Sequence, residues 1–101
     1  MAGQILTVVS ATVEPAREAD LAAAYRAVLR DEELPDGLLA SALMRGEEGR
    51  WQIATLWRDR QALDTARSRP QTPAAPRVFQ QVGAQPTLTV FEVAEAIQRA
   101  P

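Results

Sequence analysis

The sequence lacks cysteine and histidine altogether, and it contains neither lysine nor asparagine. Without cysteine there is no disulfide, no thiolate nucleophile and no cysteine-bound zinc or iron–sulfur cluster. Without histidine there is no imidazole metal site, no histidine-ligated haem and no Ser-His-Asp triad. The absence of lysine excludes Schiff-base chemistry, and every positively charged side chain is an arginine.

A strong charge imbalance is also absent. The 101 residues include 11 basic and 13 acidic side chains, which give a formal charge of −2, and 47% of the residues are hydrophobic. This composition favours one folded domain over residues 1–101 and disfavours disorder or a nucleic-acid-binding surface. No apolar run is long enough to span a bilayer, and no basic-then-apolar leader opens the chain. We expect a soluble, cytoplasmic domain that binds neither nucleic acid nor membrane.

The first third of the chain changes its apolar period from that of a strand to that of a helix. Residues 4–13 alternate, with both faces fairly apolar, which indicates a strand covered on both sides. Over residues 16–32 apolar side chains recur at helical spacing on one face. The sequence Leu34-Pro35-Asp36-Gly37 then predicts the end of that helix.

Two strand-like runs, residues 38–45 and 50–57, are joined by a connection with glycine at both ends, which suits a hairpin. Asp59 is placed to cap a short helix that Pro70 ends. Beyond it, the pattern predicts four further segments: an irregular loop over 71–77, one helical turn with Val78, Phe79 and Val82, a strand over 87–93 and a helical tail over 94–99. The order β-α-β-β-α-β predicts an α+β, ferredoxin-like fold, with a four-stranded antiparallel sheet and helices on one face.

Neither face of the predicted sheet is clearly polar. In the second strand, strict alternation places Leu38, Ala40, Ala42 and Met44 opposite Leu39 and Leu43. Two helices cover only one face, and large exposed apolar patches are rare on monomers. We therefore expect a homodimer that packs sheet to sheet, with a monomer of mildly apolar surface as the alternative.

The segment from Gly37 to Leu63 combines several features in order. A glycine opens the second strand, a hairpin leads into a strand that ends in Trp57, and an Asp59 cap precedes an Ala-Leu pair. With the strand over 88–93, these features resemble the antibiotic biosynthesis monooxygenase (ABM) domain over roughly residues 4–93, which leaves a tail at 94–101. The resemblance implies a dimeric α+β barrel, with a small apolar pocket in each monomer between sheet and helices.

The resemblance also implies a range of activities. Some members of that family oxidise aromatic polyketide intermediates with dioxygen and need no metal or flavin, because the electron-rich substrate itself reduces oxygen. It therefore implies a monooxygenase without cofactor, for a small hydrophobic or aromatic molecule or an enolisable one. Haem-degrading members use a strand tryptophan with a helix histidine and a first-strand asparagine, and this chain lacks the last two. Their absence also favours an alternative, a non-catalytic dimer that binds a small ligand.

Three side chains are candidate catalytic residues. Trp57 can form an aromatic wall or donate its indole N–H to a substrate oxygen. Tyr25, the only tyrosine, can hydrogen-bond a substrate hydroxyl or give up a proton. Arg67 can stabilise an enolate, phenolate or peroxy anion. The structural alternatives are a packing residue, a tyrosine at the edge of the core and a solvated arginine.

Trp51, Phe79 and Met44 are candidates for substrate binding by apolarity alone, with ordinary core packing as the alternative. The acidic pair Glu47-Glu48 falls in the hairpin turn and does not form a general acid/base pair. No spacing of carboxylates suggests a cage for a cation, so we expect no metal site. RNA binding on the sheet is disfavoured, because the strands show no aromatic signature for stacking bases.

Overall fold

A computed structural model describes residues 3–97 and 99 of the chain. The elements and their bounds are β1 Ile5–Thr12, the 3₁₀ turn η1 Pro15–Arg17, α1 Glu18–Asp31, β2 Leu38–Arg45, β3 Arg50–Trp57, α2 Arg60–Arg67, α3 Ala74–Gln81 and β4 Thr87–Glu92. The four strands and the first two helices agree with the predicted order. The predicted α+β, ferredoxin-like class is confirmed.

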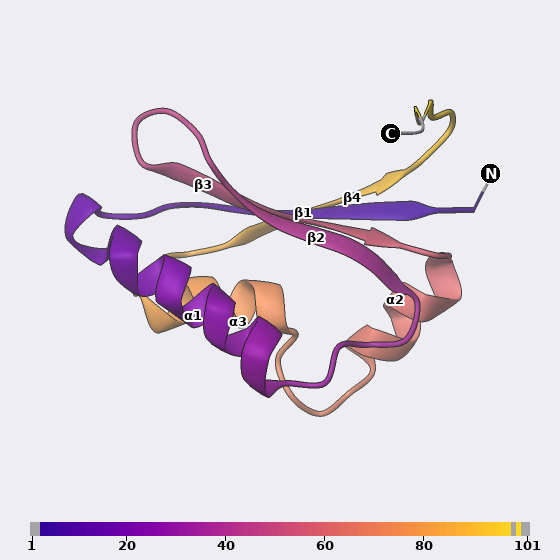
Figure 1. Cartoon of the computed structure of the whole chain (residues 1–101), viewed down its shortest axis with the longest axis horizontal. Coiled ribbons are helices and arrows are strands. Elements are labelled where there is room, and N and C mark those ends of the chain that lie inside the picture. Colours follow the sequence, from indigo (N-terminus) through magenta and orange to yellow (C-terminus); the bar gives the residue numbers. More distant parts are fainter. Residues whose placement is uncertain (1–2, 98, 100–101) are drawn as a thin grey trace.

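One sheet contains all four strands, in the order β2-β3-β1-β4, and every neighbouring pair is antiparallel. The helices α1, α2 and α3 lie on one face of this sheet (Figure 1). The register aligns Val9 of β1 with Ile53 of β3 and Leu88 of β4. Side chains that face the helices therefore form continuous rows across the sheet, because successive residues of a strand point to opposite faces.

The core under the helices is divided into two clusters. The larger one contains Leu21 of α1, Ile53 of β3 and Phe79 of α3. The smaller one surrounds Trp57 at the end of β3 and Leu63 of α2. The predicted single face of the third strand is confirmed, since its alternate residues are all buried: Trp51, Ile53, Thr55 and Trp57.

Strict alternation fails at the start of β2. The pairing with β3 shifts register between Leu38 and Ala40, as a β-bulge does. Leu38 therefore packs against the smaller cluster on the helix side. The expectation that it shares a face with Ala40, Ala42 and Met44 was wrong, because a local bulge leaves no mark in a run of small apolar residues. Beyond the bulge the alternation is regular, so Ser41 lies on the helix side with Leu43, and its hydroxyl contacts the hydroxyl of Tyr25 of α1.

The segment after α2 is more helical than predicted, and the C-terminal segment less so. α3 begins at Ala74, inside the expected loop over 71–77, and it buries Val78 and Phe79. Pro76 is tolerated because it occupies the first turn, where a backbone N–H has no partner within the helix. The expected tail helix is absent over 94–97 and at residue 99; residues 98 and 100–101 lie outside the described part.

No helix covers the other face of the sheet among residues 3–97 (Figure 1). Leu6 of β1 pairs with Leu56 of β3 and Phe91 of β4 on this outer face. Phe91 is 50% exposed, and Met44 of β2 is also exposed. Among the described residues, no helix is long and apolar enough to cross a membrane.

Candidate functional site

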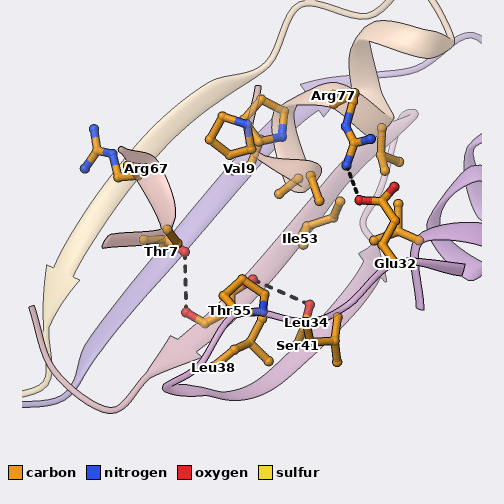
Figure 2. Close-up of a pocket in the computed structure, with 18 of the residues that line it drawn as sticks. Thr7, Val9, Glu32, Leu34, Leu38, Ser41, Ile53, Thr55, Arg67 and Arg77 are labelled. Carbon is orange, nitrogen blue, oxygen red and sulfur yellow. Dashed lines mark hydrogen bonds and ion pairs between the residues drawn. The ribbon is translucent and has the colours of Figure 1, made fainter. Parts of the chain in front are cut away.

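A cavity of about 370 Å³ lies between the sheet and the helices (Figure 2). Its floor comes from β1, β2 and β3, and its walls come from α1, α2, α3 and the loops that follow α1 and α2. Members of both core clusters line it, so it lies where the two clusters separate. The volume is within the range of small-molecule sites, about 300–1,000 Å³.

All three candidate catalytic residues line this one cavity. Tyr25 projects from α1, Trp57 lies at the end of β3, and Arg67 is the last residue of α2. Tyr25 and Trp57 are 32 positions apart in the sequence, and Trp57 and Arg67 are 10 positions apart. The fold therefore brings together an aromatic ring, a phenol and a guanidinium around the same space.

The indole N–H of Trp57 is already used inside the protein. It donates to the Oγ1 of Thr7 at 3.1 Å, and the Thr7 hydroxyl donates to the carbonyl oxygen of Thr55 at 3.4 Å. Both threonines are only 6% exposed. Buried polar groups of this kind are normally paired, so breaking this contact has a cost. Trp57 thus lines the cavity with its ring, while its N–H links β3 to Thr7 of β1 on the cavity floor.

Arg67 lies at the rim of the cavity. Its side chain is exposed, and it forms no ion pair within the described part of the chain. Figure 2 shows its guanidinium at the edge of the site, directed away from Thr7 and Thr55. In this position Arg67 can reach an anion only at the cavity mouth.

The three residues predicted to bind substrate do not line the cavity. Trp51 donates its indole N–H to Glu18 Oε2 at 2.9 Å, and the guanidinium of Arg45 lies 5.2 Å from its ring centre. Phe79 is fully buried in the larger cluster, and Met44 lies exposed on the outer face. Apolarity alone could not distinguish pocket lining from core or from outer surface.

Hydroxyl groups that the sequence analysis did not single out lie on the floor. The Tyr25 hydroxyl is 2.8 Å from Ser41 Oγ of β2, and Thr55 Oγ1 donates to the same Ser41 oxygen over a long 3.5 Å contact. Threonine at the inward positions 7 and 55 was the available signal, since polar residues rarely occupy a buried strand face without a role.

Arg77 is another arginine in the lining, which also includes Arg67 and Arg69. Its Nη2 donates to Glu32 Oε1 at 2.7 Å, which joins the start of α3 to the end of α1 (Figure 2). This hydrogen bond raises the pKa of the Arg77 guanidinium, against the opposing effect of burial. The side chain is 30% exposed, yet its Nε is buried without a partner. Sequence reasoning missed Arg77 because it lies in a segment expected to be a surface loop.

Carboxylates do not gather into a metal site in the described part of the chain. No group of three or more acidic side chains there is close enough to hold a cation. Glu32 is engaged by Arg77, and Glu18 is engaged by Trp51 and Arg45 at the other end of α1. What the cavity offers a ligand is therefore a mostly apolar enclosure with hydroxyl and guanidinium groups and the carboxylates of Glu32 and Glu33.

Residues 5–76 match the profile of the antibiotic biosynthesis monooxygenase family. Among solved structures, a candidate antibiotic biosynthesis monooxygenase from Deinococcus radiodurans superposes with a TM-score of 0.74 at 17% identity, covering 96% of this chain and 99% of that one. A similar protein from Caulobacter crescentus gives 0.68 at 21% identity, over 93% and 92% of the two chains.

A variant of SnoaB from Streptomyces nogalater, described as a cofactor-independent oxygenase, gives a TM-score of 0.73 at 17% identity, over 97% of this chain and all (100%) of that one. At these identities the likeness establishes the fold. No curated protein matches the sequence significantly.

Proposed function

Because the chain belongs to the antibiotic biosynthesis monooxygenase family, we propose that it is a cofactor-independent monooxygenase for a small aromatic or enolisable molecule. The observation that carries this proposal is the mostly apolar cavity of about 370 Å³, which Tyr25, Trp57 and three arginines line. The structural likeness to SnoaB, a cofactor-independent oxygenase, supports the same reading at the level of the fold.

The proposed reaction converts an activated CH₂ group into a carbonyl. The substrate loses a proton to give an enolate, which passes an electron to dioxygen; the two radicals combine to form a carbon–oxygen bond and a peroxide. The O–O bond then breaks, one oxygen atom stays in the product, and the other leaves as water with the two hydrogens. The CH₂ carbon supplies all four electrons, so the reaction requires no external reductant.

Three residues carry the proposed chemistry. Tyr25 binds the substrate oxygen and moves a proton there. Trp57 supplies an aromatic wall, which favours flat substrates. Arg67 supplies positive charge at the cavity mouth for the enolate or peroxide, because fixed charge stabilises negative charge as it develops. Arg77 adds a second guanidinium on the opposite wall, tied to Glu32.

A second candidate function is ligand binding without catalysis. The observation that favours it is that two polar groups of the cavity are already engaged: the Trp57 indole by Thr7, and the Arg77 guanidinium by Glu32. A site whose polar groups are satisfied internally can enclose an apolar molecule without reacting with it. Binding of an aromatic molecule without oxygen consumption distinguishes this candidate.

We also propose that the active form is a homodimer in which a second copy covers the outer face of the sheet. That face carries Leu6, Leu56 and the half-exposed Phe91 in one register row, with no helix over it in the described part. Covering such a patch removes apolar surface from water. Sedimentation is expected to give about twice the chain mass of 11.0 kDa.

Oxygen consumption tests the proposed activity. The purified protein is incubated with a panel of anthrones and naphthols while dissolved oxygen and product are followed together. The proposal expects oxygen uptake above the protein-free rate, with one quinone formed for each dioxygen consumed. Binding of these compounds without any uptake would favour the non-catalytic candidate instead.

A further inference from the structure

The exposed large apolar side chains of the described part are unevenly distributed. Seven of them are exposed, and three of the seven lie away from the cavity: Met44 and Phe91 on the outer face, and Ile97 after β4. The other four are leucines, and all of them line the cavity: Leu29, Leu34, Leu39 and Leu88. Single exposed leucines are ordinary on a protein surface, but a group of them around one cavity indicates a surface that a ligand covers.

Three of these leucines lie together at one edge of the sheet. α1 lies over the edge strand β2, where Tyr25 contacts Ser41. Leu29 follows Tyr25 by one helical turn, and Leu39 precedes Ser41 by two residues. Both leucines therefore lie toward the segment that connects α1 to β2, and Leu34 belongs to that segment. These three residues are 47%, 50% and 45% exposed, and we call them the leucine rim.

Leu88 lies apart from the leucine rim. It belongs to β4, the other edge strand, where it pairs with Val9 of β1, and it is 42% exposed. The cavity thus reaches both edges of the sheet, with three exposed leucines at the β2 edge and one at the β4 edge. A part of the ligand that extends beyond the cavity contacts more apolar surface at the β2 edge.

The charged side chains next to the leucine rim in the sequence are acidic. Glu32 and Glu33 directly precede Leu34 and line the cavity with it. Arg77 forms an ion pair with Glu32, and Glu33 is exposed. A carboxylate repels an anionic group nearby, whereas a hydrocarbon chain that covers the leucines leaves water without needing a charged partner. The leucine rim therefore suits an uncharged aliphatic chain.

We propose that the leucine rim binds an aliphatic chain of the substrate, which leaves the cavity at the β2 edge while the aromatic part stays inside. This inference rests on the proposed function, since it takes the cavity as the substrate site, and it narrows the substrate class to alkyl-substituted aromatic molecules. Leu29, Leu34 and Leu39 contact the chain and determine specificity for it, and they do not touch the reacting atoms.

A series of naphthols with alkyl chains of increasing length tests the proposal. The probes are 2-naphthol and its 6-alkyl and 7-alkyl derivatives from methyl to heptyl, and the tighter-binding of the two series is used. Naphthol fluorescence measures binding without oxygen, so that no reaction occurs. A fully buried CH₂ group is expected to tighten binding about fourfold, and a chain buried on one side only about twofold for each carbon. The increase is expected to level off once the chain extends past the leucine rim.

The double variant Leu34→Ser/Leu39→Ser is expected to reduce the increment to less than about 1.5-fold for each carbon. Its affinity for unsubstituted 2-naphthol is expected to stay within about twofold of the parent value. Ile97→Ser removes an exposed aliphatic side chain away from the cavity and is the matched control, with an unchanged increment expected. Leu88→Ser tests the other edge and is expected to keep the increment. A melting curve for each variant confirms that it is folded.

A pentyl chain that ends in a carboxylate is a further probe, and it is expected to bind more weakly than the pentyl chain itself. Equal or tighter binding would overturn the proposal, because it would indicate that the arginines of the cavity hold an anionic group instead. An affinity that does not rise with chain length, or an increment lost in Leu88→Ser rather than in the double variant, would also overturn it.

Two further readouts separate this inference from other interpretations. A double variant that lowers the sedimentation mass and keeps the increment would overturn the proposal, because the leucine rim would then contact a second copy of the chain. Oxygen uptake is read separately. A protein that shows the increment but consumes no oxygen with any naphthol or anthrone contradicts the proposed function and leaves the chain-binding rim standing. A protein that consumes oxygen at a rate and affinity independent of chain length contradicts this inference alone.

Discussion

Arg67 and Arg77 line one cavity in different environments. Arg77 is tied to Glu32 and partly buried, with a raised pKa, so its charge is fixed in place. Arg67 is exposed at the end of α2, where water screens its charge. The extent to which each guanidinium stabilises a reacting anion therefore depends on how firmly the guanidinium is held and on how much water surrounds it.

Arg67→Ala tests the role proposed for the arginine at the rim. If Arg67 stabilises an anionic intermediate, the variant is expected to lower kcat at least about tenfold. Its unfolding free energy is expected to change by no more than about 0.5 kcal/mol, as for other surface substitutions. Oxygen uptake and a melting curve measure the two effects. Unchanged turnover and unchanged binding would show that Arg67 is a solvated residue, and Arg77→Ala would then be the variant to compare.

Glu18 links the stability of the fold to pH through its contacts with Trp51 and Arg45. The hydrogen bond from the Trp51 indole, followed by that from Arg45, lowers the pKa of this carboxyl. A carboxyl whose pKa is lower in the folded state stabilises the fold above its unfolded pKa and loses that contribution as the pH falls through its folded pKa. The parent is therefore expected to be more stable than Glu18→Gln at neutral pH. This difference should shrink as the pH falls below the ordinary range for glutamate.

Thermal melting over a pH series measures this effect. Glu47→Gln, in the exposed hairpin turn, is the matched control, and its effect on unfolding is expected to stay within about 0.5 kcal/mol. A stability difference for Glu18→Gln that does not change between neutral and acidic pH would contradict the role given to the Trp51 contact.

Among the helices and strands, the sequence predicted the features that follow from a periodic apolar pattern. It missed the features that depend on the backbone conformation at a single position. Alternation identified the buried face of β3, and helical spacing placed Tyr25 on the inner side of α1. In β1 both faces are apolar, so alternation could not tell which face the helices cover. The bulge after Leu38 and the start of α3 among prolines were missed, because each is decided by local backbone geometry rather than by a pattern.

The residues of the candidate site were likewise only partly predictable from the sequence. Trp57, Tyr25 and Arg67 could be assigned to one pocket because each follows from the order of elements and from one family resemblance. The contact of Ser41 with Tyr25 could not, because it depends on how β2 lies against α1. The position of Arg77 in the cavity lining could not be predicted for a similar reason, since it depends on where α3 begins.

The turn before β2 allows a test of how closely this turn packs against α2. Gly37 has φ +85°, and a Cβ there would collide with the Cβ of Ala62 in α2. Its carbonyl also accepts from the Arg58 N–H at 2.7 Å, so the turn is tied to the end of β3. Gly37→Ala is expected to destabilise the fold by more than the roughly 1 kcal/mol of an unfavourable φ alone.

Gly83→Ala is the matched control, because Gly83 has a similar φ of +76° with nothing within 4 Å of the added Cβ. Chemical denaturation of both variants separates backbone strain from the collision. Equal losses of unfolding free energy would contradict the close approach of Gly37 to α2.

In the molecule as a whole, helices cover one face of the sheet (Figure 1). Apolar side chains lie on both faces. The helix side is the buried core with its cavity, and the outer side carries Leu6, Leu56 and Phe91. We therefore propose different roles for the two faces: the cavity on the helix side binds a small molecule, and the outer face contacts a second copy of the chain.

Phe91→Glu tests that second face. A carboxylate in the middle of an apolar interface is costly to bury without a partner, so the variant is expected to shift the sedimentation mass from about twice the chain mass towards one. Leu29→Glu is the matched control, since Leu29 is 47% exposed against 50% for Phe91 but lies on α1, across the sheet. A monomeric parent, or a Phe91→Glu variant that remains dimeric, would contradict this use of the face.

We propose that the cavity supports the oxidation of a small aromatic or enolisable molecule by dioxygen alone. Isotopically labelled dioxygen tests it most directly, with anthrone as the substrate and mass spectrometry of the quinone product. We expect one labelled oxygen atom to enter each quinone and the other to appear in water, at a rate that heat-denatured protein does not reproduce. Label in the quinone at no more than the protein-free rate would contradict the claim.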